Sequence, residues 1–186
     1  QLEPHMLFNT LANLRVLIAL DPPRAQAMLD QLIAFLRATL NASRVGQHAL
    51  SAEFSRIADY LALMKVRMGE RLQTQLVLPD ELAGLPVPPL LLQPLVENSI
   101  RHGLEPKVEG GRIELEASRE GEVLVLRVHD TGVGLADPSA DGTHFGLQQV
   151  RERLATLYGD RASLQLSAAA DSSGGAVATI RLPITP

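Results

Sequence analysis

The sequence predicts an α+β fold in which a short helical segment is followed by an α/β sandwich. Near the start of the chain, two apolar runs with helical spacing flank the chain breaker Asp21-Pro22-Pro23. Further along, stretches that alternate with a period of two, as strands do, are mixed with stretches that repeat every three to four residues, as helices do. The polar stretch 43–48 separates these two parts. We therefore place the domains at 1–46 and 47–186.

The composition excludes several classes of protein. The chain has 186 residues, of which 46% are apolar and only 3% aromatic, so we expect a core of Leu, Val, Ile and Ala. A net charge of −4 offers no basic footprint for nucleic acid, and the absence of cysteine excludes disulfides. There is no apolar run of membrane-spanning length and no signal peptide. Because the chain starts at Gln1 in the middle of a motif, we expect a fragment whose upstream part is missing.

The first predicted helix has an apolar seam with 4-3-4 spacing, formed by Leu7, Leu11, Leu14 and Ile18. At about 100° per residue, His5 lies roughly 200° around the helix from this seam. We therefore expect its imidazole to be reachable from solvent.

The second predicted helix runs from about residue 24 to residue 41. It carries a wide apolar stripe made of Met28, Leu29, Leu32, Phe35, Leu36 and Leu40. Two short helices with such stripes leave apolar surface uncovered. Pairing with a second copy in a four-helix bundle would cover it, and we favour this interpretation over packing on the rest of the same chain.

The second domain is predicted to begin with a helix capped by Ser51 and ending at Gly69. Its buried positions follow 3-4-3-4 spacing and are Phe54, Ile57, Leu61, Met64 and Met68. Alternation predicts strands at 72–78, 112–118, 122–130, 162–167 and 176–182, with a helix at 146–158 and a hairpin at 172–175.

The stretch 88–103 is predicted to be a core helix, which begins with two prolines and ends with a glycine. Its C-terminal half carries four polar side chains, which are Glu97, Asn98, Arg101 and His102. In an α-helix the last three of these share one face, because they are spaced i, i+3 and i+4. Such a group suits an anionic ligand with a metal ion, and the alternative is a solvated helix end.

Asp130 follows the strand 123–129 with the same parity as the apolar residues Leu124, Leu126 and Val128. Its carboxylate should therefore point to the apolar side, where it needs a donor, and a ligand amino group would serve. Gly132 and Gly134 then allow a tight turn and a close backbone approach.

The segment 135–143 is predicted to be a loop, either a mobile lid or an ordinary surface loop. Gly146 opens the next helix, whose free N–H groups suit phosphate. No Gly-x-x-x-x-Gly-Lys string is present, which excludes a P-loop.

These motifs resemble those of the GHKL ATPase and kinase superfamily. The N box is matched by Glu97-Asn98 with Arg101-His102-Gly103, the G1 box by Asp130-Thr-Gly132-Val-Gly134, and the G2 box by Gly142-Thr-His-Phe-Gly146-Leu147. The N-terminal string around Pro4-His5 and Phe8-Asn9 is similar to the phosphoacceptor motif of LytS-type sensor histidine kinases. The resemblance covers nearly the whole chain and implies a GHKL-type α/β sandwich that binds ATP.

For the nucleotide site, the resemblance implies that Asn98 holds Mg²⁺ and that Arg101 and His102 meet the phosphates of ATP. Asp130 would accept a hydrogen bond from the adenine amino group, and Gly132 and Gly134 would shape that wall.

For the lid, the resemblance implies that Gly142 and Gly146 shape it and that Leu147 lies beside the nucleotide. His5 would be phosphorylated and would pass the phosphoryl group to an aspartate of a response regulator, as in two-component signal transduction. Glu97 would orient His5 or take its proton, with Glu3 as a weaker candidate.

The apolar stripes of the first two helices predict a homodimer of the intact protein, and the net charge predicts no direct contact with nucleic acid. The resemblance implies the cytoplasmic portion of a bacterial protein that is anchored in the inner membrane by segments upstream of this chain.

The chain departs from the superfamily patterns at three positions. His144 replaces the middle glycine of the G2 box, which makes a positive φ harder there. Met6 follows the phosphoacceptor, where many kinases have an acid. Pro94 stands where the superfamily ATPases carry the glutamate that activates water, and it cannot act as a base. The ATPase alternative is therefore disfavoured, whereas His144 supports a second alternative, a nucleotide-binding scaffold without kinase activity.

Overall fold

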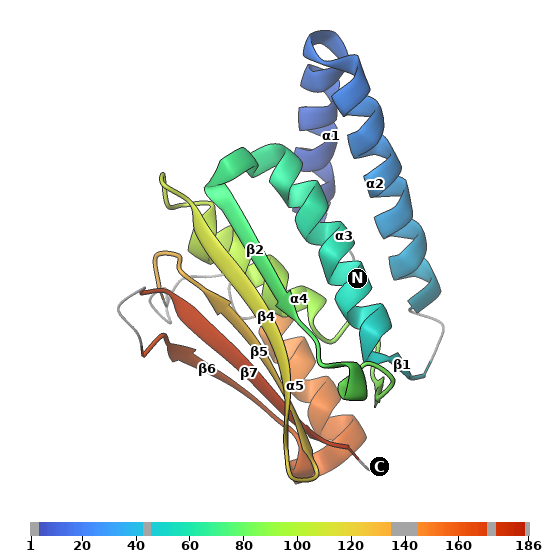
Figure 1. Ribbon diagram of the computed structural model, residues 1–186, viewed down its shortest axis with the longest axis vertical. Coiled ribbons are helices and arrows are strands. Elements are labelled where there is room, and N and C mark those ends of the chain that lie inside the picture. Colours follow the sequence, from blue (N-terminus) through green and yellow to red (C-terminus); the bar gives the residue numbers. More distant parts are fainter. Residues whose placement is uncertain (1–3, 43–45, 135–144, 171–173, 185–186) are drawn as a thin grey trace.

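A five-stranded sheet forms one layer of the molecule, and helices cover one of its faces (Figure 1). The computed structural model describes residues 4–42, 46–134, 145–170 and 174–184. The helices are α1 (Pro4–Leu20), α2 (Pro22–Ala42), α3 (Leu50–Met68), α4 (Gln93–Asn98) and α5 (Phe145–Tyr158). The strands are β1 (His48–Ala49), β2 (Leu72–Val77), β3 (Pro86–Val87), β4 (Gly111–Glu120), β5 (Val123–Asp130), β6 (Ser163–Ala168) and β7 (Ala176–Pro183). The predicted fold class, a helical segment followed by an α/β sandwich, is confirmed.

The large sheet has the strand order β2-β4-β5-β7-β6, so β5 lies at its centre. Strand β2 runs parallel to β4, whereas the pairs β4–β5, β5–β7 and β7–β6 are antiparallel. At the end of β5, Asp130 lies opposite Ile113 of β4 and Ala176 of β7. The register therefore surrounds this carboxylate-bearing residue with backbone on both sides.

The core forms between the sheet and α3, α4 and α5. The predicted stripe of α3 is buried throughout, and so are the alternate residues of β5 that the sequence assigned to the apolar face. The predicted 172–175 hairpin joins β6 and β7, which do pair as antiparallel strands, although residues 172 and 173 lie outside the described part of the chain.

The start of α3 differs from the prediction, because Ser51 is not its N-cap. The helix begins at Leu50, and no side chain caps it. Instead, Leu50 N–H donates to Leu85 O at 2.8 Å and Ser51 N–H donates to Ala83 O at 2.9 Å. Carbonyl groups from a loop distant in sequence satisfy the first turn, and a local sequence pattern could not reveal them.

The helical hairpin of α1 and α2 packs on α3 and protrudes beyond the sheet (Figure 1). The predicted break holds: α2 starts with Pro22, and Asp21 accepts a hydrogen bond from Arg24 N–H. At the other end of the hairpin, the rings of Phe35 and Tyr60 lie 5.7 Å apart. The hairpin and α3 thus share one core, and the domain boundary near residue 46 stays a prediction.

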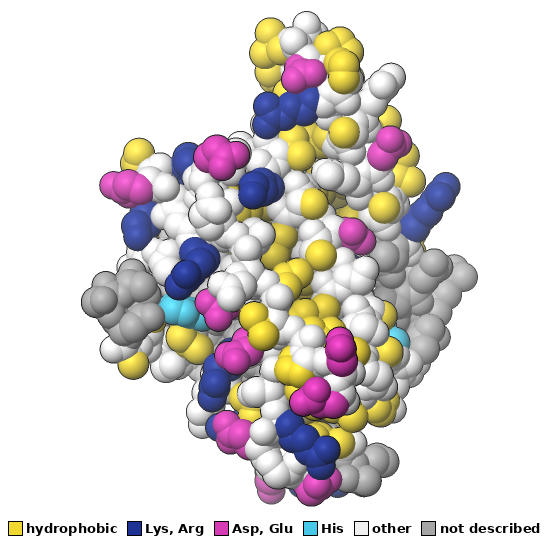
Figure 2. All heavy atoms as spheres, viewed as in Figure 1, with side chains coloured by type: hydrophobic (Ala, Val, Ile, Leu, Met, Phe, Trp, Pro, Cys, Tyr) yellow, Lys and Arg dark blue, Asp and Glu magenta, His cyan; other side chains and the backbone are white. Residues whose placement is uncertain are grey.

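The predicted seam of α1 is wrong in part. Leu14 is buried, but Leu11 and Ile18 are 49% and 60% exposed, and the inward face also includes the buried Thr10. The sequence of α1 is apolar on more than one side, so its spacing alone could not identify the side that meets α2 and α3. Figure 2 shows apolar side chains on the protruding hairpin. The exposed ones are Phe8, Leu11, Val16, Ile18, Leu20, Leu29, Ile33 and Leu40.

None of the described helices combines the length and the apolar character that crossing a membrane requires.

A glycine substitution tests the end of α3. Gly69 has a φ of 61°, and nothing lies within 4 Å of an added Cβ, so Gly69→Ala introduces backbone strain without a clash. With ψ at −141°, Gly69 occupies a region that other residues rarely adopt, and we expect the substitution to lower the free energy of unfolding by about 1–3 kcal/mol. Gly84→Ala is the matched control, because an added Cβ there also meets open space and φ is not positive. Denaturant unfolding of both variants provides the measurement. Equal stabilities of the two variants would contradict the positive φ assigned to Gly69.

Candidate nucleotide site

The segment that carries the predicted polar cluster is shorter and differently wound than the sequence suggests. Helix α4 begins at Gln93, not at the prolines of residues 88 and 89, with Pro94 in its first turn. A π-helical turn, Ser99–Leu104, then continues it. Gly103 therefore lies inside this turn and does not close an α-helix. Single π turns are rare in proteins, and those that do occur are often found at functional sites.

The π turn also changes the argument for a shared face. In the described structure, Arg101 is exposed, whereas Asn98 and His102 are half-buried. The i, i+3, i+4 rule of an α-helix does not apply across Ser99–Leu104, so the shared face of the three side chains stays a prediction. All three residues nevertheless lie on one continuous segment, and Gly103 of this segment lies against the carboxylate of Asp130.

Asp130 is 2% exposed, as its parity in β5 predicts. Its carboxylate lies against the Cα of Gly103: a Cβ added at Gly103 would meet Asp130 Oδ1 at 2.7 Å and Cγ at 3.0 Å. A Cβ added at Gly175 would clash with the backbone carbonyl of Asp130. Because Gly103 and Gly175 have no side chains, Asp130 can occupy this space.

The ionisation of Asp130 reflects this surrounding. Burial raises the pKa of its carboxyl above the ordinary value of an aspartate, although three hydrogen bonds act in the opposite direction. The donors are the Gly132 N–H, at 3.0 Å from Oδ1, the side chain of Ser99 and the backbone of Ala176. Asp130 therefore has hydrogen-bond donors within the chain itself.

The turn after β5 packs backbone to backbone on the π turn. A Cβ at Gly132 would overlap the backbone of Gly103, and Val133 N–H donates to Gly103 O at 3.0 Å. Gly134 has a φ of 88°, which favours glycine. The predicted G1 turn thus requires its two glycines for different reasons. At Gly132 a side chain would overlap the backbone of Gly103, and at Gly134 the positive φ favours glycine.

Lys107 fixes the same turn from the other side. Its Nζ donates to Thr131 O at 2.8 Å, and Thr131 Oγ1 accepts a hydrogen bond from Arg112 N–H at 2.9 Å. The turn 131–134 is therefore tied to both the π turn and β4.

Helix α5 reaches the start of α4. A Cβ added at Gly146 would lie 3.6 Å from Pro94 Cβ, in ordinary contact. Leu147 is buried in the core between α5 and its neighbours. The N-terminal end of α5 thus lies beside Pro94, in the first turn of α4.

Glu97 has a defined neighbour one turn earlier in α4. The buried Gln93 donates from Nε2 to Glu97 Oε1 at 2.7 Å. This hydrogen bond from the buried Gln93 side chain orients the Glu97 carboxylate.

Parts of the predicted site lie outside the described structure. These are Gly142, His144 and the rest of the segment 135–144, and also Glu3. The backbone of His5 belongs to α1, whereas its side chain lies outside the described side chains.

Sequence reasoning missed three contributors to the site. Gly103 was assigned as a helix end, Gly175 as a hairpin residue, and Ser99 received no role. Only the glycine strings Gly103 and Gly174-Gly175 offered a signal, because a glycine can mark a close approach as well as a turn. The contact of Ser99 with Asp130 joins two elements and leaves no trace in local spacing.

Comparison with known proteins agrees with this architecture. Residues 1–72 match the family model described as Histidine kinase, and residues 89–186 match the model described as Histidine kinase-, DNA gyrase B-, and HSP90-like ATPase. The sensor histidine kinase BtsS of Escherichia coli is 33% identical over 184 residues, and the sensor protein LytS of Staphylococcus haemolyticus is 31% identical over 175 residues. These matches cover 98% and 88% of this chain but only 32% and 30% of those proteins. The chain thus spans about a third of the length of the curated relatives.

Solved structures share the fold. The histidine kinase domain of the Erythrobacter litoralis EL346 blue-light activated histidine kinase aligns with a TM-score of 0.56 at 16% identity, over 99% of this chain and 88% of that one. The catalytic domain of the histidine kinase ThkA aligns with a TM-score of 0.58 at 15% identity, over 75% of this chain and 97% of that one. At such identities the likeness concerns the fold alone.

The raised pKa of Asp130 predicts a pH dependence of stability. Because the folded state binds this proton more tightly, its contribution is fully present below the ordinary aspartate pKa, about 3.9, and is lost as pH rises through the folded pKa. Asp130→Asn removes this titration. The free energy of unfolding of the wild type should therefore decline relative to that of the variant as pH rises through this window. Urea unfolding at a series of pH values tests this, and a difference independent of pH would contradict it.

Proposed function

Since the chain belongs to the histidine kinase-, DNA gyrase B- and HSP90-like ATPase family, and within it resembles the sensor kinases, we propose that it is the catalytic core of a two-component sensor histidine kinase. It binds Mg-ATP, phosphorylates His5, and transfers the phosphoryl group to an aspartate of a response regulator. The observation that carries this proposal is the buried Asp130 carboxylate, which lies between the glycines of the N box and the G1 turn.

The nucleotide base fits this carboxylate by its chemistry. Asp130 is a buried acceptor, and the backbone of Gly103, Gly132 and Gly175 lies close to it. Such an acceptor suits a flat ligand with an amino donor, as adenine has. In the proposed complex, Asp130 accepts from the adenine amino group, while Gly132 and Gly134 form the adjoining wall.

The phosphates of ATP would lie near the π turn that follows α4 and near the start of α5. Arg101 and His102 supply N–H donors, and Gly146 lies in the first turn of α5, where the N–H groups have no partner within the helix. Gly142, outside the described residues, would shape the lid with Gly146, and Leu147 would support the nucleotide from the core.

A magnesium ion would be held by Asn98. Among the described residues, no group of three or more acidic or histidine side chains could bind a metal alone. One amide oxygen from Asn98 together with phosphate oxygens and water fits the preference of Mg²⁺ for oxygen ligands. The ion would supply charge neutralisation at the phosphates.

The transfer itself requires an imidazole nitrogen of His5 in line with the γ-phosphorus. A bond forms between this nitrogen and phosphorus while the bond from phosphorus to the bridging oxygen breaks, and ADP leaves with the electron pair. The ring then loses its other N–H proton. Glu97, oriented by Gln93, is the proposed acceptor of that proton or the group that orients His5.

Two alternatives use the same nucleotide site. A superfamily ATPase would need a water-activating acid one turn before Asn98, and Pro94 cannot supply it. A nucleotide-binding scaffold without kinase activity would follow if His144 impaired the closure of the lid. The motif around His5 favours the kinase over both.

The partners follow from the same proposal. The receiver domain of a response regulator accepts the phosphoryl group, and a second copy of the chain covers the exposed apolar side chains of α1 and α2 in a four-helix bundle. The parent protein is proposed to be anchored in a membrane through segments outside this chain.

Labelling decides between the three functions. Incubation of the protein with γ-labelled ATP and Mg²⁺ is expected to give an acid-labile protein label, and His5→Gln should abolish it, because glutamine cannot form the phosphoramidate. The variant should bind ADP with unchanged affinity, which controls for folding. Steady phosphate release without protein label would support the ATPase instead. Nucleotide binding with neither product would support the scaffold.

A further inference from the structure

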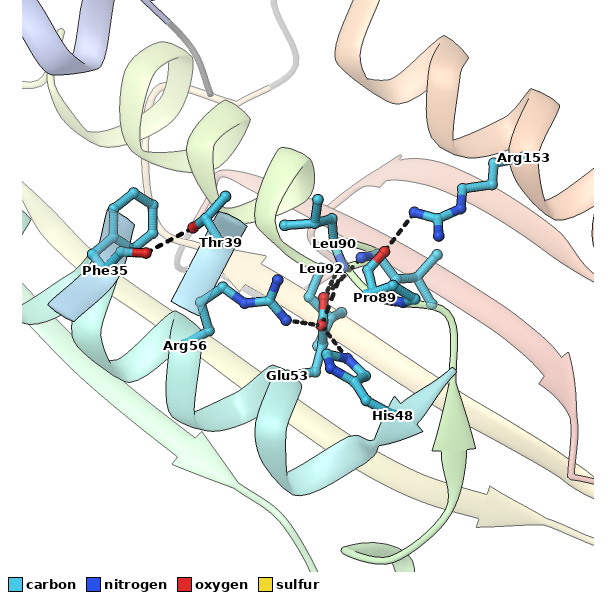
Figure 3. A network of polar contacts seen from close by, with 10 residues as sticks. Phe35, Thr39, His48, Glu53, Arg56, Pro89, Leu90, Leu92 and Arg153 are labelled. Carbon is cyan, nitrogen blue, oxygen red and sulfur yellow. Dashed lines mark hydrogen bonds and ion pairs between the residues drawn. The ribbon is translucent and has the colours of Figure 1, made fainter. Parts of the chain in front are cut away.

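A second buried carboxylate lies outside the site described above, at the start of α3. Glu53 is 1% exposed and accepts hydrogen bonds at both oxygens (Figure 3). Oε1 accepts from the backbone N–H groups of Leu91 and Leu92, at 2.7 and 3.2 Å. Oε2 accepts from Leu90 N–H at 3.3 Å and contacts the side chains of His48 and Arg56, at 2.7 and 2.5 Å. This carboxylate therefore joins α3 to a loop almost forty residues later in the sequence.

Glu53 is held in its ionised form. Burial by itself would raise its pKa, but the hydrogen bond with His48, the charge of Arg56 and the Leu92 N–H outweigh burial, so the pKa lies below the ordinary value of a glutamate. A charged acceptor forms stronger hydrogen bonds to backbone N–H groups than a neutral one.

The loop that Glu53 binds has a costly conformation. Leu90 has a φ of 60°, the only positive φ of a non-glycine residue in the described part of the chain. A second side chain holds the same loop: Arg153 of α5 donates to Pro89 O at 2.5 Å (Figure 3). Such a conformation persists only where its surroundings determine it, and both α3 and α5 contribute here.

The loop leads directly into α4. Leu92 is the residue that precedes Gln93, the first residue of the helix, and Asn98 is the last. The far end of this segment is tied to Asp130 and to the G1 turn through Gly103. Glu53 and the G1 turn thus hold the two ends of α4 and its π-helical continuation, and Asn98 lies between these two points.

We infer that Glu53 is a positioning residue for the magnesium-nucleotide complex, acting through the loop 90–92 and α4 on Asn98. The inference rests on the proposed function. It assigns to Glu53 no contact with ATP, and it separates two parts of the affinity. The adenine part depends on Asp130, which Glu53 does not touch, whereas the metal-dependent part depends on the direction of Asn98.

Glu53→Gln is the first test variant. The glutamine oxygen can still accept from Leu91 and Leu92, but its NH₂ group cannot accept from Leu90, His48 or Arg56. This variant also leaves the buried charge of Arg56 without its carboxylate, which destabilises the fold for a reason unrelated to the site. The double variant Glu53→Gln/Arg56→Met removes that charge and should recover part of the thermal stability.

A loss of stability alone is controlled by Ile57→Val. Ile57 is buried on α3 one turn from Glu53 and takes no part in the polar network. This variant should unfold at a lower temperature but bind nucleotides as the wild type does.

Titration calorimetry with a non-hydrolysable ATP analogue, with Mg²⁺ and with EDTA, provides the measurement. In the wild type, Mg²⁺ should strengthen binding. In both variants at residue 53, affinity with Mg²⁺ should fall about tenfold or more, while affinity in EDTA stays within about twofold. Wild-type affinity with Mg²⁺ in the double variant would overturn the inference, and so would an equal loss in Mg²⁺ and EDTA. No binding by the wild type would instead contradict the proposed function.

Discussion

The burial of one carboxylate, that of Asp130, is the constraint on which the site depends. An aspartate at the end of a central strand is costly to bury, and its raised pKa records that cost. The surrounding residues accommodate it by losing side chains: Gly103 leaves room for the carboxylate and Gly175 for the backbone beside it. The π turn and the glycine positions therefore meet at the end of the central strand β5.

A second consequence is that α4 is held from two directions. The G1 turn contacts its C-terminal continuation through Gly103 and Gly132, and the ionised Glu53 binds the loop before its start. Helix α3, which carries Glu53, also packs on the hairpin that contains His5. One helix thus contacts both the predicted phosphoacceptor segment and the support of the nucleotide site.

The sequence predicted those features that depend on local pattern. The parity of β5 predicted the burial of Asp130, and spacing predicted the buried face of α3. Features that depend on contacts distant in sequence were missed. The π turn places Gly103 beside Asp130, although nothing in 99–104 distinguishes it from an α-helix. No role was predicted for Glu53, because its partners at 90–92 are brought to it only by the fold. The apolar residues around α1 did not define a single inward face.

The central claim is that Asp130 accepts the amino group of an adenine base, and base discrimination tests it most directly. Inosine diphosphate differs from ADP in carrying an oxygen in place of this amino group, so it presents an acceptor to an acceptor. The account predicts that ADP binds at least about a hundredfold more tightly than inosine diphosphate, and that Asp130→Asn narrows the gap, since its amide can donate. Equal affinities of the wild type for both nucleotides would contradict it.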